Sequence, residues 1–285
     1  MQESRNYAPS NPFSPYVLRH YVFEAALPAD FELIDKLLSE TAFIRLLMRG
    51  DWQAEDTPGE WREAGPAVLF GANSRPMRVR VKGPFKVVGV AIRPSGWRAL
   101  FGCPASAFAD RMVALSDAWG PDADRLYAKV AAARSDAETV AAIEDVFQRR
   151  LNASEDPAID RPMRAFETIA RHGSTMRVDD AARQLGLSVR QMERHCCSLF
   201  GHMPKMVLRR SRFLDVAMAI RGFTDPSQEE LLALRYFDQS HLNREFKRFI
   251  GMPPGKFART PTPLFTAGLK LRSEGIGLGA LDQAA

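Results

Sequence analysis

The stretch from Ser188 to Pro254 contains the same short pattern twice. The segment SVRQMERHCCSLFGHMP, which begins at Ser188, aligns with DQSHLNREFKRFIGMPP, which begins at Asp238, at an offset of fifty residues. The matched pairs include Arg194 with Arg244, Gly201 with Gly251, and Pro204 with Pro254. Similarity at a fixed offset indicates a duplicated supersecondary unit. The sequence therefore predicts two copies of one short helix, and with them two copies of one task.

The ends of both copies carry helix start and stop signals. Ser188 and Asp238 are N-cap types, whose side-chain oxygens accept a hydrogen bond from an otherwise unpaired backbone N–H. Ser188 and Gln191 form a capping-box pattern, as do Ser227 and Glu230 further on. Each copy ends at a glycine, which takes the left-handed conformation after a helix at little cost.

The net charge of +5 is unevenly distributed. Residues 1–159 hold 19 basic and 21 acidic side chains, whereas residues 160–260 hold 18 basic and 11 acidic ones. The basic excess thus coincides with the duplicated half, where a nucleic-acid footprint would be concentrated. A solvated basic surface is the alternative that composition alone leaves open.

Composition also restricts the class of protein. No apolar run approaches the roughly 18 residues that indicate a membrane span, and the N-terminus lacks the layout of a signal peptide. Three cysteines cannot all pair internally, so we expect a reducing cytoplasm. Residues 21–171 contain no histidine, which makes a metal-dependent enzyme a poor hypothesis, and we expect neither metal nor cofactor.

The first half shows strand patterns followed by helix patterns. Residues 1–16 are rich in Pro, Asn and Ser and predict an irregular lead-in. From Tyr16 to Ile92 short apolar runs alternate with Gly and Pro turns, and residues 77–82 alternate strictly between apolar and basic. The pattern predicts a small barrel or sandwich. The Arg78, Arg80 and Lys82 side chains should line its solvated face, and contact with an acidic ligand is the alternative.

Helices should follow Pro94. Val140, Ile143, Phe147 and Leu151 form one apolar stripe at helical spacing. Packing within its own domain explains this stripe more simply than a dimer seam does. The polar segment 152–160 predicts a linker, so we expect a β-rich sensor or dimerisation domain over 1–151, a helical domain over 161–260, and a flexible tail over 261–285.

The helical half has the layout of a helix-turn-helix unit: a short helix, a Gly-containing turn and a second helix beginning at Ser188. In the first duplicated helix the spacing places one set of side chains inward: Val189, Met192, Cys196 and Leu199. In the second copy the corresponding inward set is Leu242, Phe246, Phe249 and Ile250. The opposite, polar faces remain available to enter a groove.

The segment that connects the copies, about 18 residues long, would span roughly 27 Å as a helix. Successive major grooves on one face of DNA lie about 34 Å apart. A helix of this length can therefore hold two recognition helices in adjacent grooves, as a dimer of single helix-turn-helix units does. The alternative is a helical bundle in which the repeat is only structural.

These features resemble the AraC/XylS family of transcription regulators over Pro162 to Arg259. The segment DQSHLNREFKRFIGMPPGKF carries the most specific part, with Leu242 in place of an aromatic residue. Arg235 stands where the second turn usually has glycine, and Cys196 replaces a bulky aromatic. The resemblance implies two helix-turn-helix motifs joined by a linker helix, with both recognition helices in the major groove. It implies these base-contacting candidates: Arg190, Glu193, Arg194, Gln239, Ser240, Asn243 and Arg244. Helical spacing adds Lys247 on the outward face of the second helix as a further DNA-contacting candidate.

The first half is similar to the cupin-like sensor domain that precedes this unit in many members of the family. The fold class expected is therefore α+β: a cupin-like barrel with trailing helices, then an all-α double helix-turn-helix domain. The implied partners are operator DNA and a small-molecule effector, with RNA polymerase and a second copy of the chain as further partners to consider.

Two other classes of function stay open at this point. In one, the first half is an enzyme and the basic half only locates it on nucleic acid; a deep pocket of convergent ionisable groups or a metal would favour it. In the other, the helical half is a signalling adaptor that binds protein and has only non-specific affinity for DNA.

Overall fold

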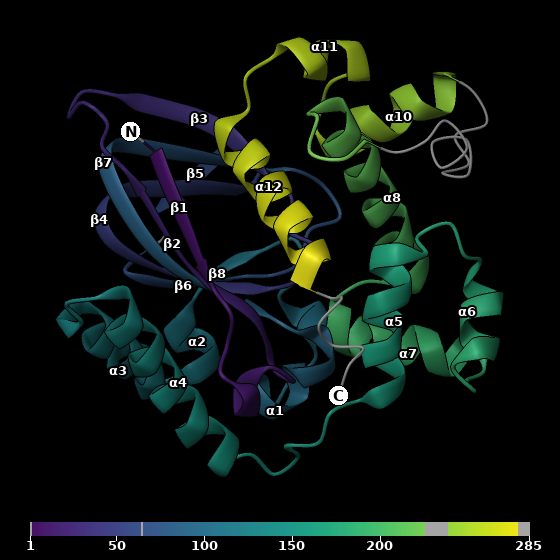
Figure 1. Cartoon of the computed structure of the whole chain (residues 1–285), viewed down its shortest axis with the longest axis horizontal. Coiled ribbons are helices and arrows are strands. Elements are labelled where there is room, and N and C mark those ends of the chain that lie inside the picture. The colour runs from purple at the N-terminus through teal and green to yellow at the C-terminus, as the bar shows by residue number, and fades with distance from the viewer. Residues whose placement is uncertain (1, 64, 226–238, 279–285) are drawn as a thin grey trace.

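The computed structural model describes residues 2–63, 65–225 and 239–278. The N-terminal half is built on an antiparallel sheet in which the order β1-β2-β7-β4-β6-β8 is extended by β3 beside β7 and β5 beside β4. Figure 1 shows this curved sheet beside the helical half. The strands are β1 (Gln2–Tyr7), β2 (Val17–Ala25), β3 (Glu32–Leu37), β4 (Phe43–Thr57), β5 (Glu60–Glu63), β6 (Ala67–Phe70), β7 (Met77–Ile92) and β8 (Met112–Ala114).

The expected division into a β-rich first half and a helical second half is confirmed. One expectation at the N-terminus is wrong: Gln2–Tyr7 is a strand, not an irregular lead-in. Its sequence, QESRNY, has no apolar pattern, and it becomes extended because its backbone pairs with β2. Strand formation here depends on a partner that local sequence does not reveal.

The long strands β4 and β7 form the centre of the sheet. The alternation over residues 77–82 is confirmed, since the apolar side chains are buried and the basic ones face outward. The ladder between the two strands is interrupted by register shifts on both sides of Arg49. Gly50 there has φ 93°, and a Cβ atom would lie 2.7 Å from the Cβ of Phe85, so only glycine fits. Such bulges bend a strand, which helps the sheet to curl.

Helices cover one face of the sheet. Ile44, Leu46, Val88 and Val90 pack in one core with side chains from the helices that follow the sheet. Ile143 and Phe147 are fully buried in that core, so the apolar stripe does pack within its own half. The helices here are α1 (Trp97–Phe101), α2 (Leu115–Trp119), α3 (Pro121–Ala132) and α4 (Asp136–Asn152), with 3₁₀ turns η1 (Asn11–Phe13), η2 (Pro94–Gly96) and η3 (Ala105–Ala107).

The helical half begins at α5 after the connection 153–160. Its helices are α5 (Arg161–His172), α6 (Val178–Gln184), α7 (Val189–Phe200), α8 (Pro204–Ile220), α10 (Gln239–Phe249), α11 (Pro254–Arg259) and α12 (Pro263–Leu278). Figure 1 shows α8 between the regions of α7 and α10. None of the helices in the described ranges is long and apolar enough to cross a membrane.

The expected flexible tail is wrong for Pro263–Leu278, which forms helix α12. Leu264, Phe265 and Leu269 of this helix are buried. Asp35 of β3 caps the N-terminus of this helix. Its Oδ2 atom accepts hydrogen bonds from the backbone N–H groups of Leu264 and Phe265 at 2.7 and 3.2 Å. The apolar residues and this cap hold the segment against the sheet.

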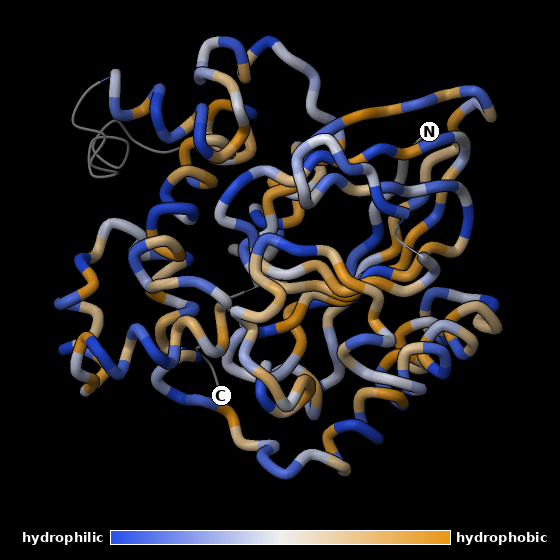
Figure 2. Tube along the Cα trace, turned by 180° about the vertical axis from the view of Figure 1, so that it is seen from behind, coloured by the Kyte–Doolittle hydropathy of each residue, from blue (hydrophilic) through white to orange (hydrophobic). Residues whose placement is uncertain are grey.

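The two halves share their hydrophobic cores. The largest core runs from Phe13 of the first half to Leu208 of α8. A second lies on the other face of the sheet and includes Leu264 of α12, and the third joins α8, α10, α11 and α12. Figure 2 shows hydrophobic residues concentrated along the central strands. The helical half is therefore packed onto the sheet rather than connected to it by the linker alone.

Candidate DNA-binding surface and effector cavity

Helix α7 forms as the sequence predicts. The Ser188 side chain caps the helix, and Gln191 completes the capping box. Met192, Cys196 and Leu199 are buried against neighbouring helices. Val189 is not part of this inward face: it is 42% exposed, because it lies in the first turn, beyond the edge of the packed surface. Gly201 ends the helix with φ 78°, as expected.

The polar face of α7 points to solvent. Arg190 and Arg194 are exposed, and Glu193 is half-buried. His195 does not belong to this face, since its Nδ1 atom lies 2.8 Å from the Oδ2 atom of Asp160, the residue that caps α5. The three residues predicted for the first motif therefore lie on one face of α7. The contact between His195 and Asp160 holds the helix on its opposite side.

Helix α10 has the same construction. Phe246, Phe249 and Ile250 are buried and Leu242 is half-buried, as predicted. Glu245, which is only 2% exposed, accepts a hydrogen bond from Arg209 of α8, with 2.7 Å between Arg Nε and Glu Oε2. This ion pair fixes the rotation of α10 against the linker helix.

The predicted polar residues of α10 also lie on one outer surface. Gln239, Ser240, Arg244 and Lys247 are exposed, and Asn243 is half-buried. Several expectations fall outside the described residues: the cap at Asp238, the capping box of Ser227 and Glu230, the apolar Leu231 and Leu232, and the turn at Arg235.

The N-terminal half holds both recognition helices at their C-terminal ends. The Nε2–H of His202, just after α7, donates to the carbonyl oxygen of Ala72 at 2.9 Å. Lys36 of β3 donates to the carbonyl oxygen of Ile250, just after α10, at 2.6 Å. A cation at this end of a helix also opposes the helix dipole favourably. The separation of α7 and α10 therefore depends on the sheet as well as on α8.

A cavity of about 740 Å³ lies between the sheet and the helical half. Its floor is the face of the sheet opposite α2–α4 and includes aromatic side chains such as Tyr21, Phe43 and Trp52. Its remaining walls come from the 37–41 segment and from α5, α8 and α12. Tyr21 can lie flat on the sheet because its neighbour is Gly89, where a Cβ atom would be 1.9 Å from the tyrosine ring.

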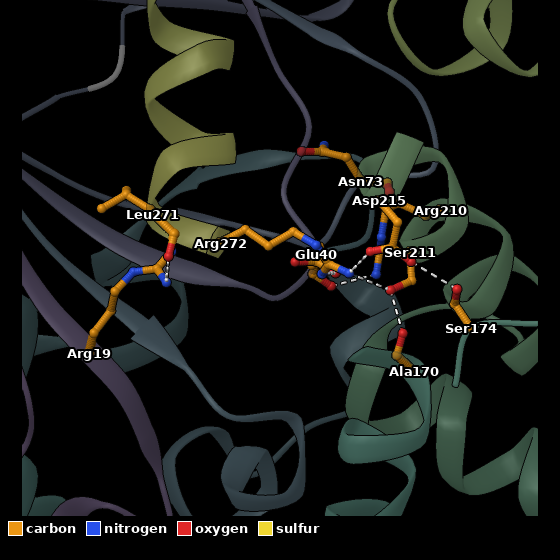
Figure 3. Close-up of polar contacts among 10 residues, drawn as sticks. All are labelled: Arg19, Glu40, Asn73, Ala170, Ser174, Arg210, Ser211, Asp215, Leu271 and Arg272. Atoms are coloured by element: carbon orange, nitrogen blue, oxygen red, sulfur yellow. Dashed lines mark hydrogen bonds and ion pairs between the residues drawn. The ribbon is translucent and has the colours of Figure 1, made fainter. Parts of the chain in front are cut away.

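One side of the cavity is closed by a buried polar cluster (Figure 3). Arg272 of α12 is 3% exposed and forms ion pairs with Glu40, on the segment before β4, and with Asp215 of α8. Its Nη2 atom also donates to the hydroxyl oxygen of Ser211 at 2.9 Å. Burial raises the pKa of Glu40, but the guanidiniums of Arg272, Arg171 and Arg210 together outweigh it and hold that pKa below its ordinary value.

Arg210 joins the linker helix to the first half. It is 1% exposed and donates to the carbonyl oxygens of Asn73 and Glu40. Burial lowers the pKa of its guanidinium to about 10. Hydrogen bonds from a buried, charged side chain to two carbonyls are costly to break, so α8 cannot shift without disturbing the walls of the cavity.

Sequence reasoning missed the residues of this cavity, especially Arg19, Arg45, Arg171, Arg210 and Arg272. One signal existed for Arg45: in FIRLLM it occupies the same alternation phase as Phe43 on an apolar strand. The role of Arg272 had no such signal, since its partners lie 57 and 232 residues away in the chain.

The cavity contains ionisable groups, but they suit binding rather than proton transfer. Most are arginines, which remain protonated and act only as donors. Within the described ranges, no group of three or more His, Cys, Asp and Glu side chains could hold a metal ion. Neither feature favours an enzyme over a ligand-binding site.

Comparisons with known proteins agree with the helix-turn-helix geometry. Residues 181–260 match a family model described as a helix-turn-helix domain, and residues 5–114 match a domain of unknown function (DUF6597). No curated protein matches the chain. It is similar to ToxT from Vibrio cholerae at 13% identity and a TM-score of 0.45, covering 90% of this chain and 97% of that one. The AraC-like transcriptional activator CuxR has 14% identity and a TM-score of 0.25, covering 75% and 86%.

The matched domain, with its capped helix α7 and exposed polar face, defines a DNA-binding protein of the helix-turn-helix class. The domain is of the AraC type, and the chain is a DNA-binding transcription regulator.

Proposed function

We propose that one copy of this chain reads two successive major grooves, with α7 in one and α10 in the next. The observation that carries the proposal is the shared design of the two helices: each buries an apolar back and exposes a polar face, at different ends of α8. The 17 residues of α8 span about 26 Å. Together with the widths of the flanking helices, this length suits the spacing of about 34 Å between grooves.

The exposed residues have the chemistry for this task. Arginine can form two hydrogen bonds with guanine, asparagine and glutamine can do so with adenine, and glutamate can accept from cytosine. We assign base contacts to Arg190, Glu193 and Arg194 on α7 and to Gln239, Ser240, Asn243 and Arg244 on α10. Lys247, a turn further along α10, suits a phosphate contact. Because the two faces differ, the two half-sites should differ in sequence.

We further propose that a small-molecule effector in the cavity controls the regulator. The cavity touches α5 and α8 of the DNA-binding half and α12 beyond it, so a ligand there contacts the elements that position both recognition helices. RNA polymerase and a second copy of the chain are the protein partners we would test first. No catalytic step is part of the proposal.

Selection of bound fragments from a random DNA library, followed by footprinting, tests the DNA-binding proposal. We expect protection over two successive helical turns and an affinity that falls steeply with salt. Arg194→Ala and Arg244→Ala should each lose discrimination at a different half-site, by about 1–3 kcal/mol. Arg149→Ala, at an exposed position of α4, is the matched control. Protection of a single turn, or wild-type discrimination by both variants, would refute the two-groove mechanism.

A further inference from the structure

The cavity carries an excess of positive charge. Seven arginines and three glutamates line it. Two of the glutamates are already neutralised: Glu167 lies 3.3 Å from Arg93 and 3.1 Å from Arg164, and Glu40 pairs with Arg272. The third, Glu274, is exposed at the rim. The guanidinium charges of the lining therefore outnumber its carboxylate charges.

Arg45 is the clearest of these groups. Its guanidinium lies over the Trp52 ring, 4.2 Å from the centroid, and 5.0 and 5.3 Å from the Phe43 and Phe70 rings. These contacts hold the plane of the guanidinium among aromatic side chains. Its Nε and Nη1 atoms are buried and have no hydrogen-bond partner in the described part of the chain.

Two more arginines approach the cavity from other elements. Arg19 of β2 donates from Nη1 to the carbonyl oxygen of Leu271 at 3.1 Å, and its Nε atom has no partner within the described ranges (Figure 3). The Nε atom of Arg171 on α5 is also buried and has no hydrogen-bond partner within the described ranges. Burial lowers the pKa of both guanidiniums, and the charge of the neighbouring Arg171 lowers that of Arg19 further.

Such an arrangement is unfavourable without an anion. A buried donor that lacks a partner loses its hydration without compensation, and the loss is larger for a charged group. Arginine is well suited to carboxylates, because its planar donors match their oxygens. The rest of the floor is aromatic and aliphatic, including Tyr21, Phe23, Phe85 and Val87, and would contact the apolar body of a ligand.

We propose that the cavity binds an organic carboxylate with an apolar body, its charged group on Arg45 and within reach of the charges of Arg19 and Arg171. A neutral molecule would leave the arginine donors unsatisfied, and a cationic one would be repelled. This inference rests on the proposal that the cavity is the effector site, and it adds the chemical class of the effector.

Calorimetric titration of the full chain tests the inference with matched probes. These are 2-naphthoate and decanoate, with 2-naphthalenemethanol and decan-1-ol as their neutral counterparts. We expect at least one acid to bind about tenfold more tightly than its alcohol, the effect of one charge-assisted hydrogen bond. Equal affinity of acid and alcohol, or no binding of either acid at millimolar concentration, overturns the inference.

Variants of Arg45 locate the charged group. Arg45→Met keeps apolar contact with the aromatic floor and should reduce acid affinity about tenfold while leaving alcohol affinity within about twofold. Retained alcohol binding shows that the cavity is still folded. Arg45→Lys keeps the charge and should keep the preference for acid. Arg49→Met, at an exposed position on the same strand, is the control and should bind as wild type does. Unchanged acid affinity in Arg45→Met overturns the assignment.

These titrations contain no DNA, so their result is independent of the footprint. If acids bind as expected and no two-turn footprint is found, the ligand class stands and the DNA-reading mechanism fails. If the footprint is found and acids bind no better than alcohols, the two-groove mechanism is supported and the proposed carboxylate class of the effector is wrong.

Discussion

The Nη2 atom of Arg272 lies 2.6 Å from the Oδ1 atom of Asp215, which joins the last described helix to the linker helix between the two recognition helices. The same guanidinium pairs with Glu40 on the segment that leads into the central strand of the sheet. One side chain thus connects the sheet, the linker helix and the helix that covers the cavity. A displacement of any one of these three elements therefore alters the contacts of this guanidinium with the other two.

Arg272→Met should destabilise the protein by about 3 kcal/mol, because it leaves two carboxylates without their buried partner. Urea unfolding followed by circular dichroism measures the loss. Lys270→Met, at an exposed position of the same helix, serves as control and should change stability by less than about 0.5 kcal/mol. Equal unfolding midpoints for the two variants would show that the cluster contributes little.

The contribution of Glu40 should depend on pH. Burial raises the pKa of this carboxyl, but Arg272 and Arg171 outweigh it, so the folded-state pKa lies below the ordinary value. The resulting stability is present above the unfolded-state pKa of about 4.3 and is lost as the pH falls through the lower folded-state value. Wild type should therefore exceed Glu40→Gln in stability at pH 7, and the difference should shrink below about pH 4.3. Urea midpoints between pH 3 and 7 test this, and a constant difference contradicts it.

Lys36→Met should loosen α10 without unfolding the sheet. The lysine provides the hydrogen bond to the Ile250 carbonyl, and a charged donor there contributes about 1.5–3 kcal/mol. Hydrogen exchange of the backbone amides in α10 should become faster, while exchange in β7 stays unchanged. Lys82→Met, an exposed position on β7, is the control. Identical exchange in α10 for both variants would mean that the sheet does not support this helix.

Gly89→Ala should cost about 1–3 kcal/mol, because the added methyl group would overlap the ring of Tyr21. Combining it with Tyr21→Ala removes the overlap, so the double variant should show a clear non-additive recovery. Thermal unfolding of the two single variants and the double variant measures the coupling. Strict additivity would indicate that the ring moves aside freely.

Local patterns predicted much of this structure, and the exceptions have physical causes. The capping box at Ser188 and the alternation of residues 77–82 are local, so both were predicted correctly. Strand β1 was missed because only its pairing with β2 makes it extended. Helix α12 was missed because its stability comes from Asp35 and Arg272, whose partners lie far away in the chain.

The candidate functional residues also fall into two groups, those that the sequence predicts and those that it does not. The residues proposed for DNA contacts come from the resemblance to the AraC/XylS family and from helical spacing, both of which can be read along the chain. The cavity was not found, because strands β1, β2, β3, β4 and β7 and helices α5, α7, α8 and α12, which are separated along the chain, form it together. Of its residues only Arg45, a charged side chain in an apolar strand, stood out from its surroundings.

The position of α12 has a consequence for engineering and for exchange of domains between regulators. The chain returns to the sheet after the DNA-binding helices, so the last described segment belongs to the ligand site of the first half as much as to the second. A hybrid joined at the connection 153–160 would bring its own α12 with the new DNA-binding half. Such a chimera would change its ligand preference along with its operator, unless residues 263–278 were grafted back from the original protein.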